Sequence, residues 1–305
     1  MSGFESTLTL PTPCQLLESS GLLDRPVWVK RDDMLHPVVS GNKYRKLKYP
    51  LLNIAASARQ AGHIPRLITM GGLWSNHVHA TAYAANAMGY QSHALIRGHE
   101  GMHSAMLDDC RQAGMQIQFV DRVNYRSLRE NPAHRMTLIA PAANQYWLPE
   151  GGSDPAALMG VAELIDELPF IPDVILVGCG TAATMAGLLA GLKGRSVVIG
   201  IAVLQDGGYL KREVGRLLAQ AGYPDYQNYQ LRADFHHGGY ARVSPDLHQF
   251  CHDFILQYQM PVEPVYTGKV FFALKSLIHS GEILARQSVM VLHTGGLQGA
   301  RGLQL

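Results

Sequence analysis

Four basic side chains lie within six residues near the start of the chain: Lys43, Arg45, Lys46 and Lys48, in the segment SGNKYRKLKY (residues 40–49). Only 16% of the chain is charged, so the cluster is local. Such a cluster can form an exposed helical face, a patch for phosphate or nucleic acid, or the surroundings of one reactive lysine. Taken alone, it favours the exposed face.

Three further segments have the composition of anion-binding turns. They are GCGTAAT, with residues 180–184 before a helical pattern, GGLWSNHV, with Ser75 and Asn76 at a helix start, and HTGG, with residues 294–296. Small residues let an anion approach backbone N–H groups at a helix start, and hydroxyl groups add donors. Each segment alone has a simpler explanation, because glycines after strands usually form turns and Ser or Asn before a helix usually caps it.

Strand and helix patterns alternate along the chain and position these segments. The expected strands are residues 65–72, 92–98, 115–120, 173–180, 196–204 and 288–296, and the expected helices are residues 75–89, 103–114, 184–192, 208–221 and 244–258. This order predicts an α/β protein with mainly parallel sheets flanked by helices, in which ligands gather beyond the carboxyl ends of the strands. The Pro/Gly-rich segment 148–155 is the expected domain boundary.

Composition excludes several classes of protein. The 305 residues are enough for two domains that share a cleft, and the net charge of +2 gives no reason to expect nucleic acid or an acidic membrane as a partner. Cys14, Cys110, Cys179 and Cys251 lie far apart, without the spacing of a zinc or redox site, which indicates reduced, mostly buried thiols. The chain has neither a signal-peptide pattern nor a run of eighteen apolar residues, so we expect a soluble, cytoplasmic protein.

Taken together and in order, the motifs resemble a known family. The motifs are KRDD (30–33), SGNKYRKL (40–47), WSNH (74–77), GGSDP (151–155), GTAAT (180–184), GGYA (238–241), PVYTGK (264–269) and HTGG (293–296). They are similar to those of the aminocyclopropane-carboxylate deaminase and D-cysteine desulfhydrase family, pyridoxal-phosphate enzymes of the tryptophan-synthase-β fold. The resemblance implies a larger cofactor domain of residues 1–45 and 149–305 and a smaller mobile domain of residues 46–148.

The resemblance assigns a role to the basic cluster and to the cofactor contacts. It implies that Lys43 binds pyridoxal 5'-phosphate covalently, that Asn76 contacts the phenolic oxygen of the cofactor, and that Gly180, Thr181, Ala182, Ala183 and Thr184 form the phosphate loop. A reactive lysine must be neutral to attack, and we expect the positive field of Arg45 and Lys46, with partial burial, to lower its pKa. Lys48 is then expected to be solvated.

Other motif positions are expected to contact the substrate. The resemblance implies that Ser75 binds the substrate carboxylate and assists proton transfer, with Trp74, Asn76 and His77 of the same motif beside it. It also implies that Tyr240 and Tyr266 position the substrate and tune a nucleophile or a leaving group. The candidate catalytic residues are Lys43, Ser75, Tyr240 and Tyr266. The candidate substrate-binding residues are Trp74, Ser75, Asn76 and His77.

The chain departs from the family pattern at several of these positions. Ala182 and Ala183 replace two glycines of the phosphate loop, so positive φ is disfavoured and a more helical loop is expected. Tyr44 replaces a small threonine, and Trp74 stands where glutamine is common, which reshapes the pocket. Pro50 lies inside the helix expected after Lys43 and is predicted to kink it or to restart it.

Thr267 favours one activity over another. The deaminase branch of the family has a glutamate at this position, which holds the pyridine nitrogen of the cofactor protonated, whereas a threonine hydroxyl supports a neutral pyridine, the weaker electron sink. We therefore expect α,β-elimination from a small amino acid such as D-cysteine, giving a keto acid, ammonia and sulfide, with Lys43 as the base for the Cα proton. The alternatives are 1-aminocyclopropane-1-carboxylate deaminase, which releases 2-oxobutyrate, and a non-catalytic cofactor-binding protein.

Two further expectations concern metals and assembly. A metal site at His77 and His79, or at His236 and His237, is disfavoured, because H-x-H on a helix points the rings to different faces and no carboxylate or cysteine stands at ligand spacing. The resemblance implies a homodimer. The expected partners are therefore a small amino-acid substrate and a second copy of the chain. Neither nucleic acid nor a membrane is expected as a partner.

Overall fold

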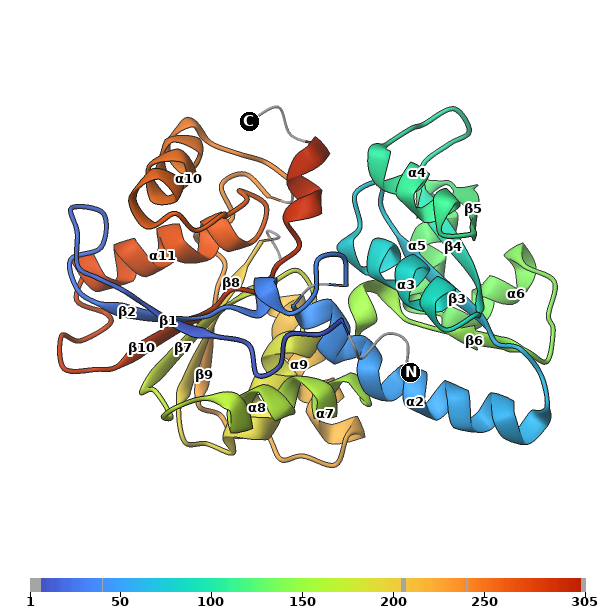
Figure 1. The fold of residues 1–305 in the computed structure, drawn as a ribbon, viewed down its shortest axis with the longest axis horizontal. Helices are drawn as coiled ribbons and strands as arrows, with labels where there is room; N and C mark the ends of the chain where they lie inside the picture. The colour runs from blue at the N-terminus through green and yellow to red at the C-terminus, as the bar shows by residue number, and fades with distance from the viewer. Residues whose placement is uncertain (1–6, 40, 204–206, 240, 303–305) are drawn as a thin grey trace.

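Two separate β-sheets form the framework of the protein (Figure 1). The structure, a computed structural model, describes residues 7–39, 41–203, 207–239 and 241–302. One sheet has six strands and the other has four. All but one of the strand pairs are parallel, as the alternation of strands and helices predicts.

The six-stranded sheet has the order β1-β2-β10-β7-β8-β9. Its strands are β1 (Cys14–Leu17), β2 (Val27–Lys30), β7 (Val174–Cys179), β8 (Val197–Ala202), β9 (Tyr229–Arg232) and β10 (Val289–Leu292). The central strand β7 is apolar along its whole length because helices cover both faces: Ile175 and Val177 face one apolar core, and Val174 and Leu176 face the other. The antiparallel pair β1–β2 forms one edge.

Helices cover this sheet on both faces. They are α7 (Ala157–Ala162), α8 (Ala183–Leu192), α9 (Gly207–Gln220), α10 (Pro245–Tyr258) and α11 (Thr267–His279). One core includes side chains of α7, α8 and α9, and the other includes side chains of α10 and α11 (Figure 1). Helix α8 is buried on nearly all sides, which explains why its sequence is apolar throughout rather than amphipathic.

The four-stranded sheet has the order β5-β4-β3-β6 and is entirely parallel. Its strands are β3 (Arg66–Gly71), β4 (Gln91–Arg97), β5 (Met115–Val120) and β6 (Gln145–Trp147), and its helices are α3 (Asn76–Ala87), α4 (Ala105–Gln112), α5 (Arg122–Glu130) and α6 (Arg135–Leu138). Short 3-10 helices η1 (Asp32–Met34), η2 (Pro132–His134), η3 (Glu150–Gly152), η4 (Glu163–Glu167) and η5 (Leu297–Gly302) complete the described elements.

Helix α2 (Asn42–Ala61) runs from the larger sheet to the smaller one (Figure 1). Its first turn packs closely on α7, where a Cβ at Gly160 would lie 2.1 Å from the carbonyl oxygen of Arg45. The helix continues through Pro50, so the expectation that a new helix restarts there is wrong. Close packing of the first turn matters because this turn carries Lys43.

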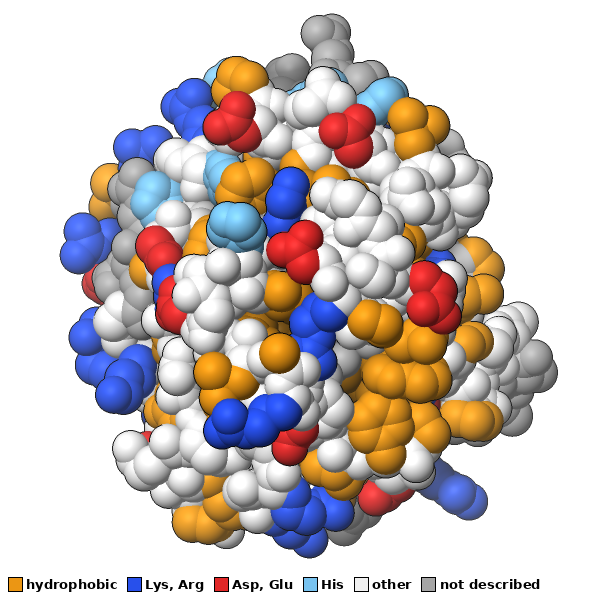
Figure 2. Space-filling view, turned by 90° about the vertical axis from the view of Figure 1, so that its left-hand side faces the viewer, with side chains coloured by type: hydrophobic (Ala, Val, Ile, Leu, Met, Phe, Trp, Pro, Cys, Tyr) orange, Lys and Arg blue, Asp and Glu red, His pale blue; other side chains and the backbone are white. Residues whose placement is uncertain are grey.

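The face that includes α10 and α11 mixes basic, acidic and histidine side chains with a patch of hydrophobic ones (Figure 2). Ile255 and Leu256 of α10 are among the exposed apolar side chains. Within the part of the chain that the structure describes, we find no helix with the length and apolar character that a membrane span requires.

All the expected strands and helices are present, with shifts of a few residues at their ends. The last strand, expected over residues 288–296, stops at Leu292, because Gly295 and Gly296 adopt positive φ of 69° and 84° and turn the chain. Strands β1, β2, β6 and β9 and helices α5, α6, α7 and α11 were not among the expected elements. The division into domains at residues 45 and 149 stays a prediction.

Candidate active site

Lys43 lies in the first turn of α2, at the edge where the larger sheet ends. The turn is held by Gly41, whose φ of 57° and close approach leave no space for a side chain: a Cβ there would lie 2.1 Å from the carbonyl oxygen of Thr294. The Lys43 Nζ donates to Oδ1 of Asn42 at 2.8 Å, and Nδ2 of Asn42 donates to Oγ1 of Thr184 at 3.0 Å. The starts of α2 and α8 are thereby tied together beside the lysine.

Burial, rather than a positive field, shifts the pKa of Lys43. Burial lowers the pKa of Lys43 from 10.5 to about 8, while the nearby carboxylate of Glu263 acts in the opposite direction. The expectation that Arg45 supplies a positive field is wrong, because its guanidinium is paired with two carboxylates. Near neutral pH a useful fraction of the Lys43 amine is therefore unprotonated.

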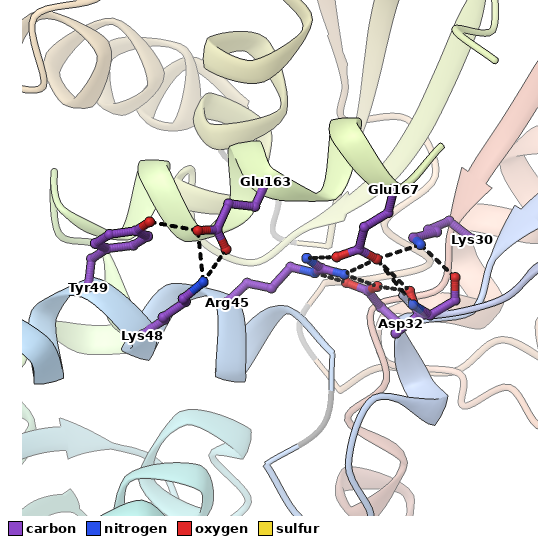
Figure 3. Close-up of polar contacts among 8 residues, drawn as sticks. Lys30, Asp32, Arg45, Lys48, Tyr49, Glu163 and Glu167 are labelled. Atoms are coloured by element: carbon purple, nitrogen blue, oxygen red, sulfur yellow. Dashed lines mark hydrogen bonds and ion pairs between the residues drawn. The ribbon is translucent and has the colours of Figure 1, made fainter. Parts of the chain in front are cut away.

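The partners of Arg45 form a buried ion-pair network (Figure 3). Nε and Nη2 of Arg45 donate to Asp32 at 2.6 and 2.8 Å, and Nη1 and Nη2 donate to Glu167 at 2.8 and 3.0 Å. Lys30 joins the network through Glu167 at 2.7 Å. The network fixes the first turn of α2 against β2, η1 and η4.

Lys48 also has a partner, so the expectation that it is solvated is wrong. Its Nζ donates to both carboxylate oxygens of Glu163, at 2.8 and 2.6 Å, and its side chain is 23% exposed (Figure 3). The hydroxyl of Tyr49 donates to the same carboxylate at 2.6 Å. Arg45, Lys48 and also Lys46, described next, therefore have hydrogen-bond partners that their spacing in the sequence does not indicate.

Lys46 and His77 lie together at one end of the site. Lys46 is buried and donates to the carbonyl of Gly151, and His77 is buried with neither ring nitrogen hydrogen-bonded within the described residues. Burial lowers the pKa of both groups well below their usual ranges, and the positive charges of Lys43 and Lys46 lower that of His77 further. His77 thus lies beside Lys46 and Gly152, rather than among the residues that line the cleft described below.

The N-terminus of α8 lies beside Gly151, whose carbonyl accepts from Lys46. Thr181 packs against Gly151, where a Cβ would lie 2.6 Å from its Cγ2. Ala182 is the N-cap residue with φ of −77° and ψ of −19°, and Ala183 begins the helix, so the loop is helical as its two alanines predict. Backbone N–H groups at a helix start and a buried lysine are the donors that a phosphate group requires.

A cleft of about 670 Å³ is lined by residues that follow β3 and β4 and by residues before α11. Its wall includes Trp74 before α3, Arg97 and His99 at the end of β4, and Tyr266 before α11. The ring of Tyr266 lies against Gly180, where a Cβ would be 2.8 Å from its Cε1. The cleft therefore lies at the carboxyl ends of the smaller sheet, the position at which open parallel sheets bind ligands, and Tyr266 is the wall residue that contacts the loop before α8.

Ser75 and Asn76 lie at the start of α3. The Ser75 Oγ accepts from the N–H of Val78 at 3.3 Å and caps the helix. The amide of Asn76 lies against Gly296, and its Oδ1 accepts from Nε2 of Gln298. Asn76 is thereby held between α3 and the turn after β10.

The GGYA and YTGK motifs each contain one tyrosine. Tyr266 lines the cleft, whereas Tyr240 lies outside the described residues. The segment before Tyr240 is anchored by Lys269, whose buried Nζ donates to the carbonyls of His236 and Gly239, both at 2.8 Å. The GGYA and YTGK motifs are therefore joined by a hydrogen bond, which their separation in sequence does not reveal.

Thr267 is buried at the start of α11, and its hydroxyl contacts Glu263. Oγ1 of Thr267 accepts from the N–H of Glu263 at 3.0 Å and donates to its Oε1 at 3.1 Å. Sequence reasoning did not find Glu263, and it also missed Asn42 and Gln298. A carboxylate in the apolar segment PVEPV is the one signal that could have identified Glu263.

The comparisons with known proteins agree with this arrangement. Residues 6–295 match the family described as pyridoxal-phosphate dependent enzyme. The chain belongs to this family. It is 28% identical over 319 residues to the bifunctional D-cysteine desulfhydrase/1-aminocyclopropane-1-carboxylate deaminase of Arabidopsis thaliana, covering 95% of this chain and 77% of the relative. It is 27% identical over 305 residues to a D-cysteine desulfhydrase of Klebsiella pneumoniae, covering 94% and 92%.

Solved structures confirm the fold class. A crystal structure described as an ACC deaminase homologue superposes with a TM-score of 0.80 at 26% identity, covering 96% of this chain and 92% of the other. A fungal L-serine ammonia-lyase from Rhizomucor miehei, at 16% identity and a TM-score of 0.63, shares the fold. The family resemblance and the α/β fold with parallel sheets are thereby confirmed.

The residues of the site fit pyridoxal phosphate. Lys43 supplies an amine that is partly neutral near pH 7, and Lys46 with the N-terminus of α8 supplies donors for the phosphate group. The ring nitrogens of His77 are buried without partners in the described structure, which an anionic ligand nearby would explain. Among the described residues, no group of three His, Cys, Asp or Glu side chains is arranged to hold a metal ion.

Proposed function

We propose that this protein is a deaminating lyase that acts on a small amino acid, with D-cysteine as the leading substrate. The reaction consumes one water and gives a keto acid, ammonia and sulfide. The observation that carries the proposal is the position of Lys43, whose amine has a pKa lowered to about 8 and is held by Asn42 beside Thr184 of the α8 loop. The relatives in Arabidopsis thaliana and Klebsiella pneumoniae, named as desulfhydrases, support it.

The proposed roles follow from the contacts. Bound pyridoxal phosphate supplies an electron sink for negative charge at the substrate Cα. Lys46 and the α8 loop, Gly180 to Thr184, hold its phosphate, and Asn76, fixed by Gln298, donates to its phenolic oxygen. Lys43 Nζ takes the proton from the substrate Cα, because its pKa places it in the range of an effective base.

The substrate side of the cleft has its own proposed residues. Ser75 binds the substrate carboxylate at the start of α3, and Trp74 limits the size of the substrate. Tyr266, and Tyr240 by family resemblance, assist departure of the β-substituent. His77 is proposed as a neutral donor to an anionic group, since burial keeps it uncharged.

Ring opening of 1-aminocyclopropane-1-carboxylate is the second candidate function. The contact of Thr267 with the buried carboxylate of Glu263 favours it, because that contact brings a carboxylate to the position where the deaminase branch is expected to have one. The bifunctional name of the Arabidopsis thaliana relative also supports it.

One experiment separates these functions. The purified protein, loaded with pyridoxal phosphate, is incubated with D-cysteine, L-cysteine and 1-aminocyclopropane-1-carboxylate, and sulfide and 2-oxobutyrate are measured. We expect sulfide from D-cysteine and loss of both activity and the absorbance band of lysine-bound cofactor in Lys43→Ala. Release of 2-oxobutyrate alone selects the second candidate, and a cofactor band with no product from any amino acid supports a non-catalytic binding protein.

Assembly and location remain predictions. A homodimer is proposed from the family resemblance, and analytical ultracentrifugation of the loaded protein tests it. A cytoplasmic location is proposed from the sequence and is tested by fractionating cells that express the full chain.

A further inference from the structure

Glu263 is a buried carboxylate near Lys43 that has no role in the leading proposal, elimination from D-cysteine. Its side chain is 1% exposed, and it lies close enough to Lys43, Lys269 and Cys251 to shift the pKa of each. Burying a carboxylate is costly unless hydrogen bonds compensate for the lost water. Its surroundings therefore require an explanation.

Backbone N–H groups supply part of that compensation. Oε2 of Glu263 accepts from Val265 at 2.8 Å, and Oε1 accepts from Tyr266 at 3.0 Å and from Thr267 at 2.7 Å. These groups lie at the start of α11, where the helix dipole also favours a negative charge. Burial raises the pKa of Glu263 to about 7, and the N–H bonds oppose the rise, so the carboxylate form dominates at pH 8.

The Thr267 hydroxyl is committed to the same carboxyl group. A threonine hydroxyl has one proton to donate and two lone pairs. Here the acceptors of the proton both belong to Glu263, Oε1 at 3.1 Å and the more distant carbonyl oxygen at 3.4 Å, and one lone pair accepts from the N–H of Glu263 at 3.0 Å. Thr267 can therefore accept one further hydrogen bond, but it has no proton left to donate.

We propose that Glu263 is a further positioning residue of the site, which keeps the ring nitrogen of the bound cofactor protonated through Thr267. The inference rests on the proposed function and on the family resemblance, which implies that Thr267 lies at that nitrogen. A neutral pyridine nitrogen needs a donor, which Thr267 cannot be while Glu263 takes its proton. A protonated nitrogen donates to the remaining lone pair, and the buried carboxylate behind it stabilises the positive charge.

This inference reverses the expectation drawn from Thr267 alone. A threonine in place of the deaminase glutamate predicts a neutral ring and a weaker electron sink. With Glu263 behind it, the threonine belongs to a pair that favours the stronger sink, which ring opening of a cyclopropane requires. The same contacts also stabilise the start of α11, so a purely structural role must be distinguished by the experiment.

The test is the ¹⁵N chemical shift of pyridoxal phosphate labelled at the ring nitrogen and bound to the full chain at pH 8. We expect the shift of a protonated nitrogen in the wild type and in Glu263→Asp, and the shift of an unprotonated nitrogen in Glu263→Gln and Thr267→Val. Glu282→Gln, which removes an exposed carboxylate on the segment after α11, is the matched control and is expected to resemble the wild type.

Each other outcome counts against the proposal. An unprotonated nitrogen in the wild type overturns it, and so does a protonated nitrogen in Glu263→Gln, which would leave Glu263 as a helix cap alone. If Glu263→Gln does not fold, Thr267→Val decides, and an unchanged shift there overturns the proposal. A change of equal size in Glu282→Gln would also overturn it. Absence of any bound-cofactor signal refutes the proposed function itself, whereas a bound but unprotonated cofactor refutes only the role of Glu263.

Discussion

Replacing Arg45 with methionine tests the ion-pair network that holds the first turn of α2. The change leaves Asp32, which is 0% exposed, with one remaining side-chain hydrogen bond, from Thr12 at 2.7 Å. Glu167 keeps its bond to Lys30 and is partly exposed, so the uncompensated charge is that of Asp32. Removing one partner of a buried pair costs about 3–5 kcal/mol, and we expect Arg45→Met to lower the free energy of unfolding by this amount.

The assay is urea unfolding followed by circular dichroism, with the slope of the transition compared between variants. The double variant Arg45→Met, Asp32→Asn removes the stranded charge and should recover part of the loss. Arg126→Met, which breaks an exposed pair with Glu130, is the control and should leave the transition unchanged. A loss below about 1 kcal/mol in Arg45→Met would refute the view that this network stabilises the turn.

Three further predictions concern the site. Gly41→Ala should lower the free energy of unfolding by about 1–3 kcal/mol, which is more than the loss expected for Gly62→Ala. Both positions have positive φ, but only a Cβ at position 41 would lie against Thr294. Equal losses of the two variants in urea unfolding would contradict this. Lys46→Met should weaken binding of pyridoxal phosphate about tenfold or more without weakening that of pyridoxal, measured by fluorescence titration; equal weakening of both would remove the phosphate role. The rate at which Lys43 captures the cofactor should rise with pH and level off above about 8, because the neutral amine is the attacking form; a rise that continues toward 10.5 would show that the amine has an ordinary pKa.

Local sequence patterns were enough to place most strands and helices. Continuous apolar runs such as Val174–Cys179 predict buried parallel strands because helices must cover both faces of the sheet. The strands that were missed, such as β6 and β9, are three and four residues long and half-buried, so their sequences carry little periodicity. Helix α11 begins with Thr267 and Gly268, two residues of low helix propensity, so the start of its sequence carries little helical signal.

Residue types also identified much of the candidate site. Lys43, Asn76 and the α8 loop were named from motifs, and the structure brings Lys43 and the loop together through Asn42. The explanation of the lysine's pKa was right about burial and wrong about the positive field of Arg45, because a charge in the sequence does not reveal its partner. Arg45 pairs with Asp32 and with Glu167, which lies 122 residues away in the chain.

The sequence by itself determined the alternation of strands and helices, the family and the candidate reactive lysine, because these depend on hydrophobic periodicity and on motifs of a few residues. Only the tertiary structure decided which charges are neutralised, that the carboxylate of Glu263 opposes the lowering of the Lys43 pKa, and that the hydroxyl of Thr267 is committed to Glu263. The physical reason is that a pKa and the direction of a hydrogen bond depend on desolvation and on partners brought close by folding. Neither can be read from the order of residues along the chain.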